Sequence, residues 1–222
     1  MDKNRVVNQI QDVVKMITKE LNLLIEQLVT KFDEISEERK SALMGLVDFI
    51  QNKRNNNEIT DLIFICTHNS RRSHLAQIWA QTAASFYNIP NVFCYSGGTE
   101  TTALYPSVTQ TLLSSGFKIQ QLSKNENSVY SFKFDENQPS IICFSKRYSD
   151  IFNPQSNFAA VMTCTHAEEN CPFIPNATKR ISLPYNDPKE FDGTPLQKAK
   201  YEERSLEIGI EMLYVFSKLK TG

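Results

Sequence analysis

The residues with the clearest chemistry are a cysteine and an arginine, Cys66 and Arg72, which five residues separate. The ionised thiol of a cysteine is a strong nucleophile, and an arginine binds a tetrahedral oxyanion through two parallel hydrogen bonds. Ser73 follows the arginine directly and brings a hydroxyl that can point back at the sulfur. A thiol, a guanidinium and a hydroxyl at this spacing predict a site where the cysteine attacks a bound oxyanion.

The segments on either side of this group predict how it is held. Residues 62–65 form an apolar run typical of a buried parallel strand, and apolar side chains recur at helical spacing from Leu75 to Trp79. In a strand–loop–helix unit the N–H groups of the loop converge, and the helix N-terminus adds partial positive charge. The residues expected to bind the oxyanion are Thr67, His68, Asn69, Ser70, Arg71, Arg72 and Ser73. A lone cysteine at a strand end is more often structural, but here the strand, loop and helix patterns together favour a catalytic one.

The string CTHNSRRS, residues 66–73, resembles the phosphate-binding loop of two protein families with a common fold. These are the low-molecular-weight protein tyrosine phosphatases and the thioredoxin-coupled arsenate reductases. His68 stands where a glycine is usual, and Arg71 where many members have a second cysteine. The SGGTE string, residues 96–100, resembles the families' second loop, which borders the first. The resemblance covers residues 59–220 and implies a three-layer α/β sandwich with a four-stranded parallel sheet.

A second strand-like run, residues 157–164, ends in Cys164, and Cys171 follows after six residues. Two such thiols can be structural, can bind zinc together with His166, or can exchange disulfides through a mobile loop. A zinc site would lack an evident fourth ligand, and the spacing fits no common zinc module, so no metal is expected. The string VMTCTHAEENCPFIP, residues 161–175, resembles the resolving segment of the arsenate reductases. Plain tyrosine phosphatases of this fold lack its pair of cysteines. The resemblance therefore implies a redox relay.

The predicted proton donor is Asp187. An Asp–Pro pair is ordinary in turns, so Asp187 and Pro188 are a weak signal by themselves. In both resembled families an Asp–Pro near the C-terminal end supplies the general acid, which implies this role for Asp187. Asp192 lies in the same predicted loop and is the alternative donor.

The remaining pattern predicts the rest of an α/β domain. Strands are expected at residues 91–95, 140–144 and 180–183, helices at 106–113 and 194–220, and an insertion or irregular hairpin at 124–138. Strands that alternate with helices favour a parallel sheet, with the oxyanion loop at its C-terminal edge.

The N-terminal part of the chain differs in composition, since it has no proline, no cysteine and no glycine before Gly45. Apolar residues recur there at helical spacing in two stretches. We expect a helical extension over residues 1–57, forming a helical hairpin, and a catalytic domain over residues 58–222. The extension is expected to pack on the domain or on a second subunit, and it is the expected interface if the chain forms a homodimer. A peptide-recognition or regulatory role is the alternative.

Composition narrows the classes of function. The 222 residues allow one sizeable α/β domain with an appendage, and a net charge of −1 without a basic stripe argues against nucleic acid as a partner. Five cysteines in a chain of this size do not indicate a secreted disulfide framework. No apolar run approaches the roughly 20 residues of a membrane span, and the N-terminus lacks the apolar core of a signal peptide. We expect a cytoplasmic protein without a membrane partner and without a cofactor.

Three hypotheses for the function follow. The resemblance implies an arsenate reductase, in which Cys66 attacks arsenate, Asp187 donates a proton, and Cys164 and Cys171 pass a disulfide to a thioredoxin-type reductant. The alternative is a protein tyrosine or small-molecule phosphatase that hydrolyses a phosphate ester through a phosphocysteine. A non-enzymatic oxyanion or thiol sensor is the third, and it is disfavoured because a sensor needs no proton donor.

Overall fold

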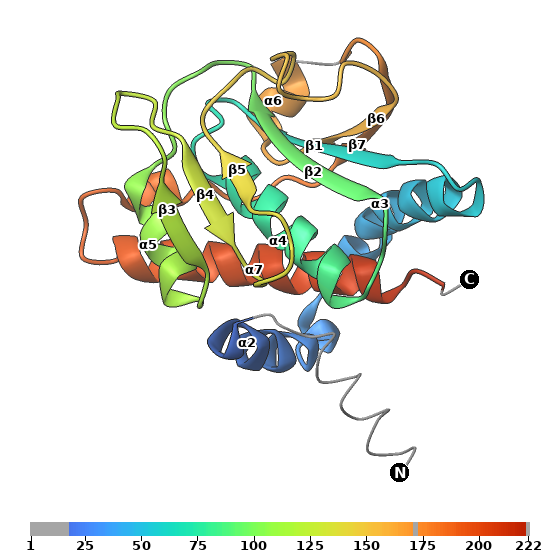
Figure 1. The fold of residues 1–222 in the computed structure, drawn as a ribbon, viewed down its shortest axis with the longest axis horizontal. Coiled ribbons are helices and arrows are strands. Elements are labelled where there is room, and N and C mark those ends of the chain that lie inside the picture. The colour runs from blue at the N-terminus through green and yellow to red at the C-terminus, as the bar shows by residue number, and fades with distance from the viewer. Residues whose placement is uncertain (1–17, 171–172, 221–222) are drawn as a thin grey trace.

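The computed structural model describes residues 18–170 and 173–220, which form a layered α/β fold (Figure 1). The central sheet consists of β1 (Thr60–Cys66), β2 (Val92–Gly98), β6 (Phe158–Met162) and β7 (Ala177–Ser182). All pairs are parallel and the order is β2-β1-β6-β7, so the predicted four-stranded parallel sheet is confirmed. Because β1 lies between β2 and β6, the end of β1 is flanked by the ends of both neighbours.

The two faces of the sheet belong to separate apolar cores, because successive side chains of a strand point to opposite faces. The helices that follow the strands are α4 (Arg72–Phe86), α5 (Pro106–Ser114), α6 (Thr165–Asn170) and α7 (Gln197–Ser217). On one face, Leu62 of β1 joins a large core with α4, α5 and α7. On the other face, Ile63 joins a smaller cluster that includes Cys66, Cys164 and Ala167 of α6. Two of the cysteines predicted to react are therefore buried in one cluster.

A second sheet of three antiparallel strands lies beside the first (Figure 1). Its strands are β3 (Lys118–Gln121), β4 (Tyr130–Lys133) and β5 (Ile141–Cys143). The strand expected at residues 140–144 is present as β5, where it pairs with β4, and the segment expected as an irregular hairpin contains the regular strand β4. Strands of three or four residues are too short to show a clear period, which explains the weak pattern in the sequence.

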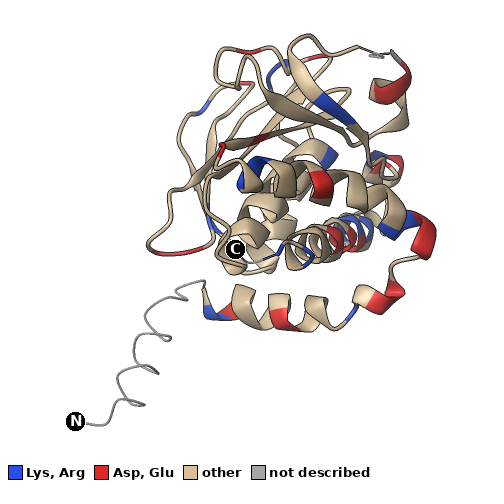
Figure 2. Cartoon of the chain, turned by 90° about the vertical axis from the view of Figure 1, so that its right-hand side faces the viewer, with Lys and Arg blue, Asp and Glu red and all other residues tan. Residues whose placement is uncertain are grey.

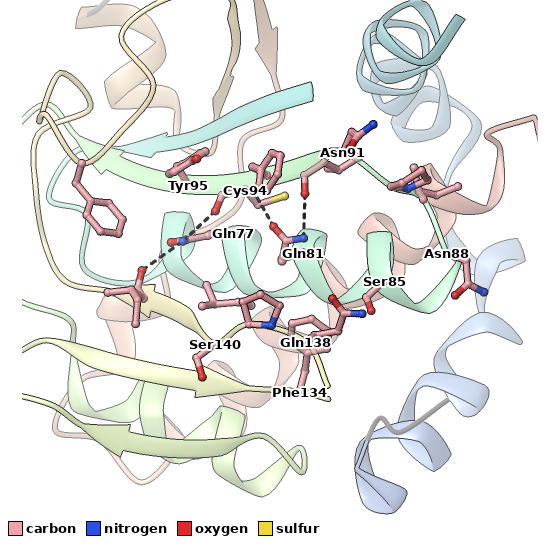
Figure 3. A pocket seen from close by; sticks show the side chains of 18 residues that line it. Gln77, Gln81, Ser85, Asn88, Asn91, Cys94, Tyr95, Phe134, Gln138 and Ser140 are labelled. Carbon is pink, nitrogen blue, oxygen red and sulfur yellow. Dashed lines mark hydrogen bonds between the residues drawn. The ribbon is translucent and has the colours of Figure 1, made fainter. Parts of the chain in front are cut away.

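The free edges of β2 and β5 border a cleft of about 570 Å³ (Figure 3). Two side-chain amides of α4 satisfy the backbone of β2 there. Gln81 donates to Val92 O at 3.1 Å and accepts from Cys94 N at 2.9 Å, and Gln77 donates to Cys94 O at 3.1 Å. An unpaired strand edge is a template for another chain, and the two glutamines occupy the groups that such a chain would use. Of the predicted site residues that the structure describes, none lines this cleft.

The N-terminal helices α2 (Lys19–Val29) and α3 (Glu37–Asn55) both pack against α7, with the short 3-10 helix η1 (Phe32–Glu34) between them. Their apolar residues, Leu21, Ile25, Leu43, Leu46 and Ile50 among them, are buried in the large core. Charged residues of both signs are interspersed along the helices (Figure 2). The predicted helical stripe also includes residues 6–17, which lie outside the described part of the chain. The domain boundary at residue 57 stays a prediction.

The C-terminal helix α7 approaches its neighbours closely at Gly209. A Cβ at this position would lie 3.0 Å from the Trp79 ring of α4 and 3.3 Å from Leu28 of α2. The indole N–H of Trp79 donates to Ser205 Oγ of α7 at 2.9 Å. The large core thus joins α2, α4 and α7. None of the helices that the structure describes is both long and apolar enough to cross a membrane.

Candidate active site

Cys66 is the last residue of β1, and α4 begins at Arg72. The Cys66 thiol is buried and lies 3.1 Å from Ser73 Oγ. Asn69 Nδ2 donates to the same Oγ at 2.8 Å, which leaves the hydroxyl hydrogen of Ser73 available to the sulfur.

The loop between Cys66 and Arg72 is held in place by hydrogen bonds that its carbonyl groups accept from neighbouring segments. The carbonyl oxygens of Thr67, His68 and Ser70 accept hydrogen bonds at 2.8, 2.9 and 3.0 Å from Glu100 N, Ser145 Oγ and Tyr105 N, respectively. The backbone N–H groups of residues 67–70 donate to no other residue that the structure describes. N–H groups fixed in place and left without partners are the donors that an oxyanion needs.

Asn69 determines the shape of the loop. It is fully buried, and its φ of 45° lies in the left-handed region that asparagine tolerates better than most residues. Its Oδ1 accepts from Lys146 N at 2.9 Å, while its Nδ2 donates to Ser73. His68, which stands where the resembled families have glycine, does not have a positive φ. A side chain is therefore compatible with the backbone at that position.

Gly98, in the SGGTE string, borders this loop. A Cβ there would lie 2.7 Å from Thr67 O and 2.8 Å from Asn69 N, closer than any real Cβ contact. The second loop can therefore approach the first only because this residue has no side chain.

Arg72 and Asp187 form an ion pair, with Arg72 Nη2 donating to Asp187 Oδ2. Arg72 Nη1 donates to Tyr185 O at 2.9 Å. The Nε–H of Arg72 is buried and has no partner among the described residues. A buried donor without a partner is costly, and a bound oxyanion would satisfy it.

Asp192, the alternative proton donor, has other partners. Arg71 Nη2 lies 2.6 Å from Asp192 Oδ2, and the Tyr201 hydroxyl donates to Asp192 Oδ1 at 2.7 Å. Burial, followed by the bond to Asp192, raises the pKa of Tyr201, so its hydroxyl stays protonated. Asp192 thus braces the oxyanion loop through Arg71, and the role of proton donor expected for Asp187 stays a prediction.

Cys164 comes two residues after the end of β6, and the sheet register brings it close to Cys66. Ile65 of β1 is paired with Met162 of β6, so the two strands end side by side. Cys164 is 1% exposed and belongs to the same apolar cluster as Cys66. The two thiols are therefore buried together at the C-terminal edge of the sheet.

A hydroxyl of the oxyanion loop lies between Cys164 and a histidine. Thr67 Oγ1 is 3.5 Å from Cys164 Sγ and 3.2 Å from His166 Nδ1. The N–H of Ala167 also donates to Cys164 Sγ, at 3.3 Å. A thiol, a hydroxyl and an imidazole in this order can carry a proton away from the sulfur.

The other cysteines have different positions. Cys171 lies outside the described residues, so its predicted place in the relay stays a prediction. Cys94 and Cys143 are buried in the large core, and burial raises the pKa of both thiols, that of Cys143 to about 12. Neither forms a thiolate near neutral pH. In the described part of the chain, no group of three or more His, Cys, Asp or Glu side chains is arranged to hold a metal ion.

Several supporting residues were not predicted from the sequence. Lys146 is 2% exposed, and burial lowers its pKa to about 8. His74 is fully buried beside Ser96 Oγ, at 3.1 Å, and burial lowers its pKa to about 3, so the ring is neutral. Neither residue stands in a pattern that the sequence marks. The position of Ser73 directly after the arginine was the one such signal, and the structure places its hydroxyl beside the sulfur.

A parallel sheet with a cysteine and an arginine at the two ends of the loop that follows β1 defines a class, the enzymes with the low-molecular-weight phosphatase fold. No protein-family model matches the chain. The arsenate reductase of Bacillus subtilis (strain 168) is 30% identical over 144 residues, which is 64% of this chain and 84% of that protein. The arsenate reductase of Bacillus licheniformis is 27% identical over 147 residues, which is likewise 64% of this chain and 84% of that protein.

A solved structure supports the fold independently. A YwlE mutant from Bacillus subtilis has a TM-score of 0.50 at 15% identity, over 73% of this chain and 99% of that chain. This likeness concerns the fold alone, whereas the sequence relatives identify the family. The chain belongs to the arsenate reductase family that shares the fold of the low-molecular-weight protein tyrosine phosphatases.

Proposed function

We propose that the protein is an arsenate reductase in which Cys66 is the nucleophile and Cys164 the second thiol. The observation that carries the proposal is the position of Cys164, buried in one cluster with Cys66 and 3.5 Å from the hydroxyl of Thr67. Hydrolysis of a phosphate ester needs the nucleophile, the arginine and the acid, but no second thiol. A reduction does need one, because a second thiol can attack the Cys66 sulfur while the group bound to that sulfur leaves with the electron pair of the broken bond.

In the first step, the loop N–H groups and Arg72 bind arsenate and the Cys66 thiolate attacks arsenic. A sulfur–arsenic bond forms, and an arsenic–oxygen bond breaks as the oxygen leaves with a proton from Asp187. Arsenate competes with Asp187 for the Nη2 donor of Arg72, so its binding releases the carboxyl group to turn toward the departing oxygen. Together with the buried Nε–H, that donor completes the two parallel hydrogen bonds of a guanidinium to an oxyanion.

In the second step, the Cys164 thiolate attacks the Cys66 sulfur. A disulfide forms, the sulfur–arsenic bond breaks, and its electron pair stays with arsenic, which leaves as arsenite. The two sulfurs lose the two electrons that arsenic gains. The proton of Cys164 leaves through Thr67 to His166.

In the last steps, Cys171 displaces Cys66 from Cys164, and a thioredoxin-type dithiol reduces the Cys164–Cys171 disulfide. This part of the cycle rests on the sequence resemblance. A cycle that ends on a dithiol reductant needs a reducing compartment, and we expect it to operate in the cytoplasm.

Two assays on one preparation test the proposal. Arsenite release is measured with arsenate, thioredoxin, thioredoxin reductase and NADPH, and ester hydrolysis is measured with p-nitrophenyl phosphate. We expect one NADPH oxidised for each arsenite released, and we expect Cys164→Ala to abolish arsenite release while ester hydrolysis persists. Robust hydrolysis without arsenite release by the wild type would instead assign a phosphatase.

A further inference from the structure

We propose that Arg39, in the N-terminal helix α3, is a positioning residue for the loop that carries Asp187. The inference rests on the proposed function, because it assigns Arg39 to the same proton donor. Arg39 lies before residue 59, where the sequence resemblance to the phosphatase fold begins. The helical extension would then contribute to the active site.

The contacts of Arg39 converge on one tyrosine. Arg39 Nε and Nη2 donate to the two oxygens of Glu211 at 2.7 and 2.9 Å. The Tyr185 hydroxyl donates to Glu211 Oε2 at 2.6 Å, and the Arg39 guanidinium lies 4.7 Å from the centre of the Tyr185 ring. Burial, followed by the Glu211 charge, raises the pKa of Tyr185 well above its ordinary value, so the hydroxyl remains a donor. The tyrosine is thus held both at its hydroxyl and on its ring face.

Tyr185 connects this group to the catalytic arginine and acid. Its carbonyl oxygen accepts from Arg72 Nη1 at 2.9 Å, and Asp187, two residues on, is paired with Nη2 of the same guanidinium. The short segment lies between Pro184 and Pro188, whose rings fix φ at both ends. Displacement of the Tyr185 ring would therefore move its carbonyl and Asp187 together.

A purely structural role for Arg39 is the competing explanation. Glu211 is 4% exposed, and a buried carboxylate without its cation is strongly destabilising. Arg39 would then only offset the charge of Glu211. The two roles predict different results when both charges are replaced by apolar side chains. Such a variant regains stability, but it regains kcat only if Arg39 has no part in holding Tyr185.

The first experiment compares two neighbouring cations of α3. Arg39→Met removes the contacts to Glu211 and Tyr185, and Lys40→Met removes an ion pair with the exposed carboxylate of Glu37. We expect Arg39→Met to lower kcat for arsenate reduction and for p-nitrophenyl phosphate hydrolysis by about 10-fold with little change in KM, because a misplaced catalytic group costs rate. Lys40→Met should leave both parameters unchanged.

A double-mutant cycle with Asp187→Asn identifies the path of the effect. If Arg39 acts through Asp187, Arg39→Met should add little to the loss already caused by Asp187→Asn. Losses that multiply in the double variant would overturn the inference. If the wild type hydrolyses the ester but releases no arsenite, the proposed function fails, and the cycle is still measured by hydrolysis, which uses the same acid.

A second variant separates rate from folding. The double substitution Arg39→Met/Glu211→Leu leaves no buried charge unpaired, so its thermal midpoint should recover toward that of the wild type. We expect kcat to stay low in this variant, because neither partner holds Tyr185. Recovery of kcat together with stability would show that Arg39 only offsets Glu211 and would overturn the inference. This variant also serves as the test if Arg39→Met does not fold.

Discussion

Substitution of Gly98 by alanine should damage the oxyanion loop directly. The new Cβ would lie 2.7 Å from Thr67 O and 2.8 Å from Asn69 N, and it would also meet Glu100 O. Carbon–oxygen contacts in proteins run at about 3.3 Å or more, so the loop must withdraw by roughly half an ångström. All three obstructing atoms are backbone atoms, so no rotamer change can relieve the contact.

The size of the effect on stability and on rate follows from the displacement of the loop backbone. Overpacking of a tight site costs about 1–3 kcal/mol in the free energy of unfolding. The displaced Asn69 N–H is one of the loop donors without a partner among the described residues, and complete loss of an oxyanion donor costs about 10²–10³-fold in rate. A partial displacement should therefore lower kcat/KM by roughly 10–100-fold.

Gly45→Ala is the matched control. A Cβ at residue 45, inside α3, meets only Ile181 Cγ2 at 3.8 Å, an ordinary contact. Replacing a glycine in a helix by alanine should stabilise the protein by about 0.5–1 kcal/mol and leave the rate unchanged. Urea unfolding followed by circular dichroism gives the stability of both variants, and initial rates give kcat/KM. A Gly98→Ala protein with the wild-type kcat/KM would refute the claim that this contact shapes the loop.

Four further outcomes are expected. Cys66→Ser should abolish both arsenate reduction and ester hydrolysis, because a hydroxyl does not ionise near neutral pH, and measurable turnover in either assay would exclude Cys66 as the nucleophile. Arg72→Lys should lower kcat/KM on the order of 10²-fold, because the bidentate hydrogen bonding is lost, and a near-wild-type value would mean that Arg72 does not bind the oxyanion. Asp187→Asn should slow single-turnover attack without weakening inhibition by sulfate, and an unchanged rate would transfer the acid role to Asp192 or to water. Burial lowers the pKa of Lys146 from 10.5 to about 8, so the unfolded chain binds more protons between these pH values and stability rises with pH there. In unfolding titrations Lys146→Met should remove that rise and stabilise the protein at pH 7 by up to about 3 kcal/mol, and an unchanged pH dependence would show that Lys146 is not its source.

The sequence predicted best what is contiguous along the chain. The strand, the oxyanion loop and the start of α4 occupy one stretch of residues, so their apolar pattern and the spacing from Cys66 to Arg72 already contain the local geometry. Cys164 and Asp187 were proposed from a family resemblance. The structure places Cys164 beside Thr67 and Asp187 against Arg72.

Contacts between segments that lie far apart in the chain could not be predicted from sequence patterns. Arg39 and Glu211 are 172 residues apart, and each looks like an ordinary charge on an amphipathic helix. Asp192 was the alternative acid because a pattern cannot show that Arg71 and Tyr201 hold it. The second sheet was indistinct because its strands are too short for a period to develop.

Arsenite is released when Cys164 attacks Cys66 and forms a disulfide with it, and peptide mass mapping under non-reducing conditions tests this central step most directly. Cys171→Ala protein is treated with stoichiometric arsenate, with Cys164→Ala as the control. We predict one arsenite released per protein and a disulfide between Cys66 and Cys164 in the first variant, and neither in the control. Arsenite released by Cys171→Ala without that disulfide, or no arsenite from a protein that hydrolyses p-nitrophenyl phosphate, would contradict the account.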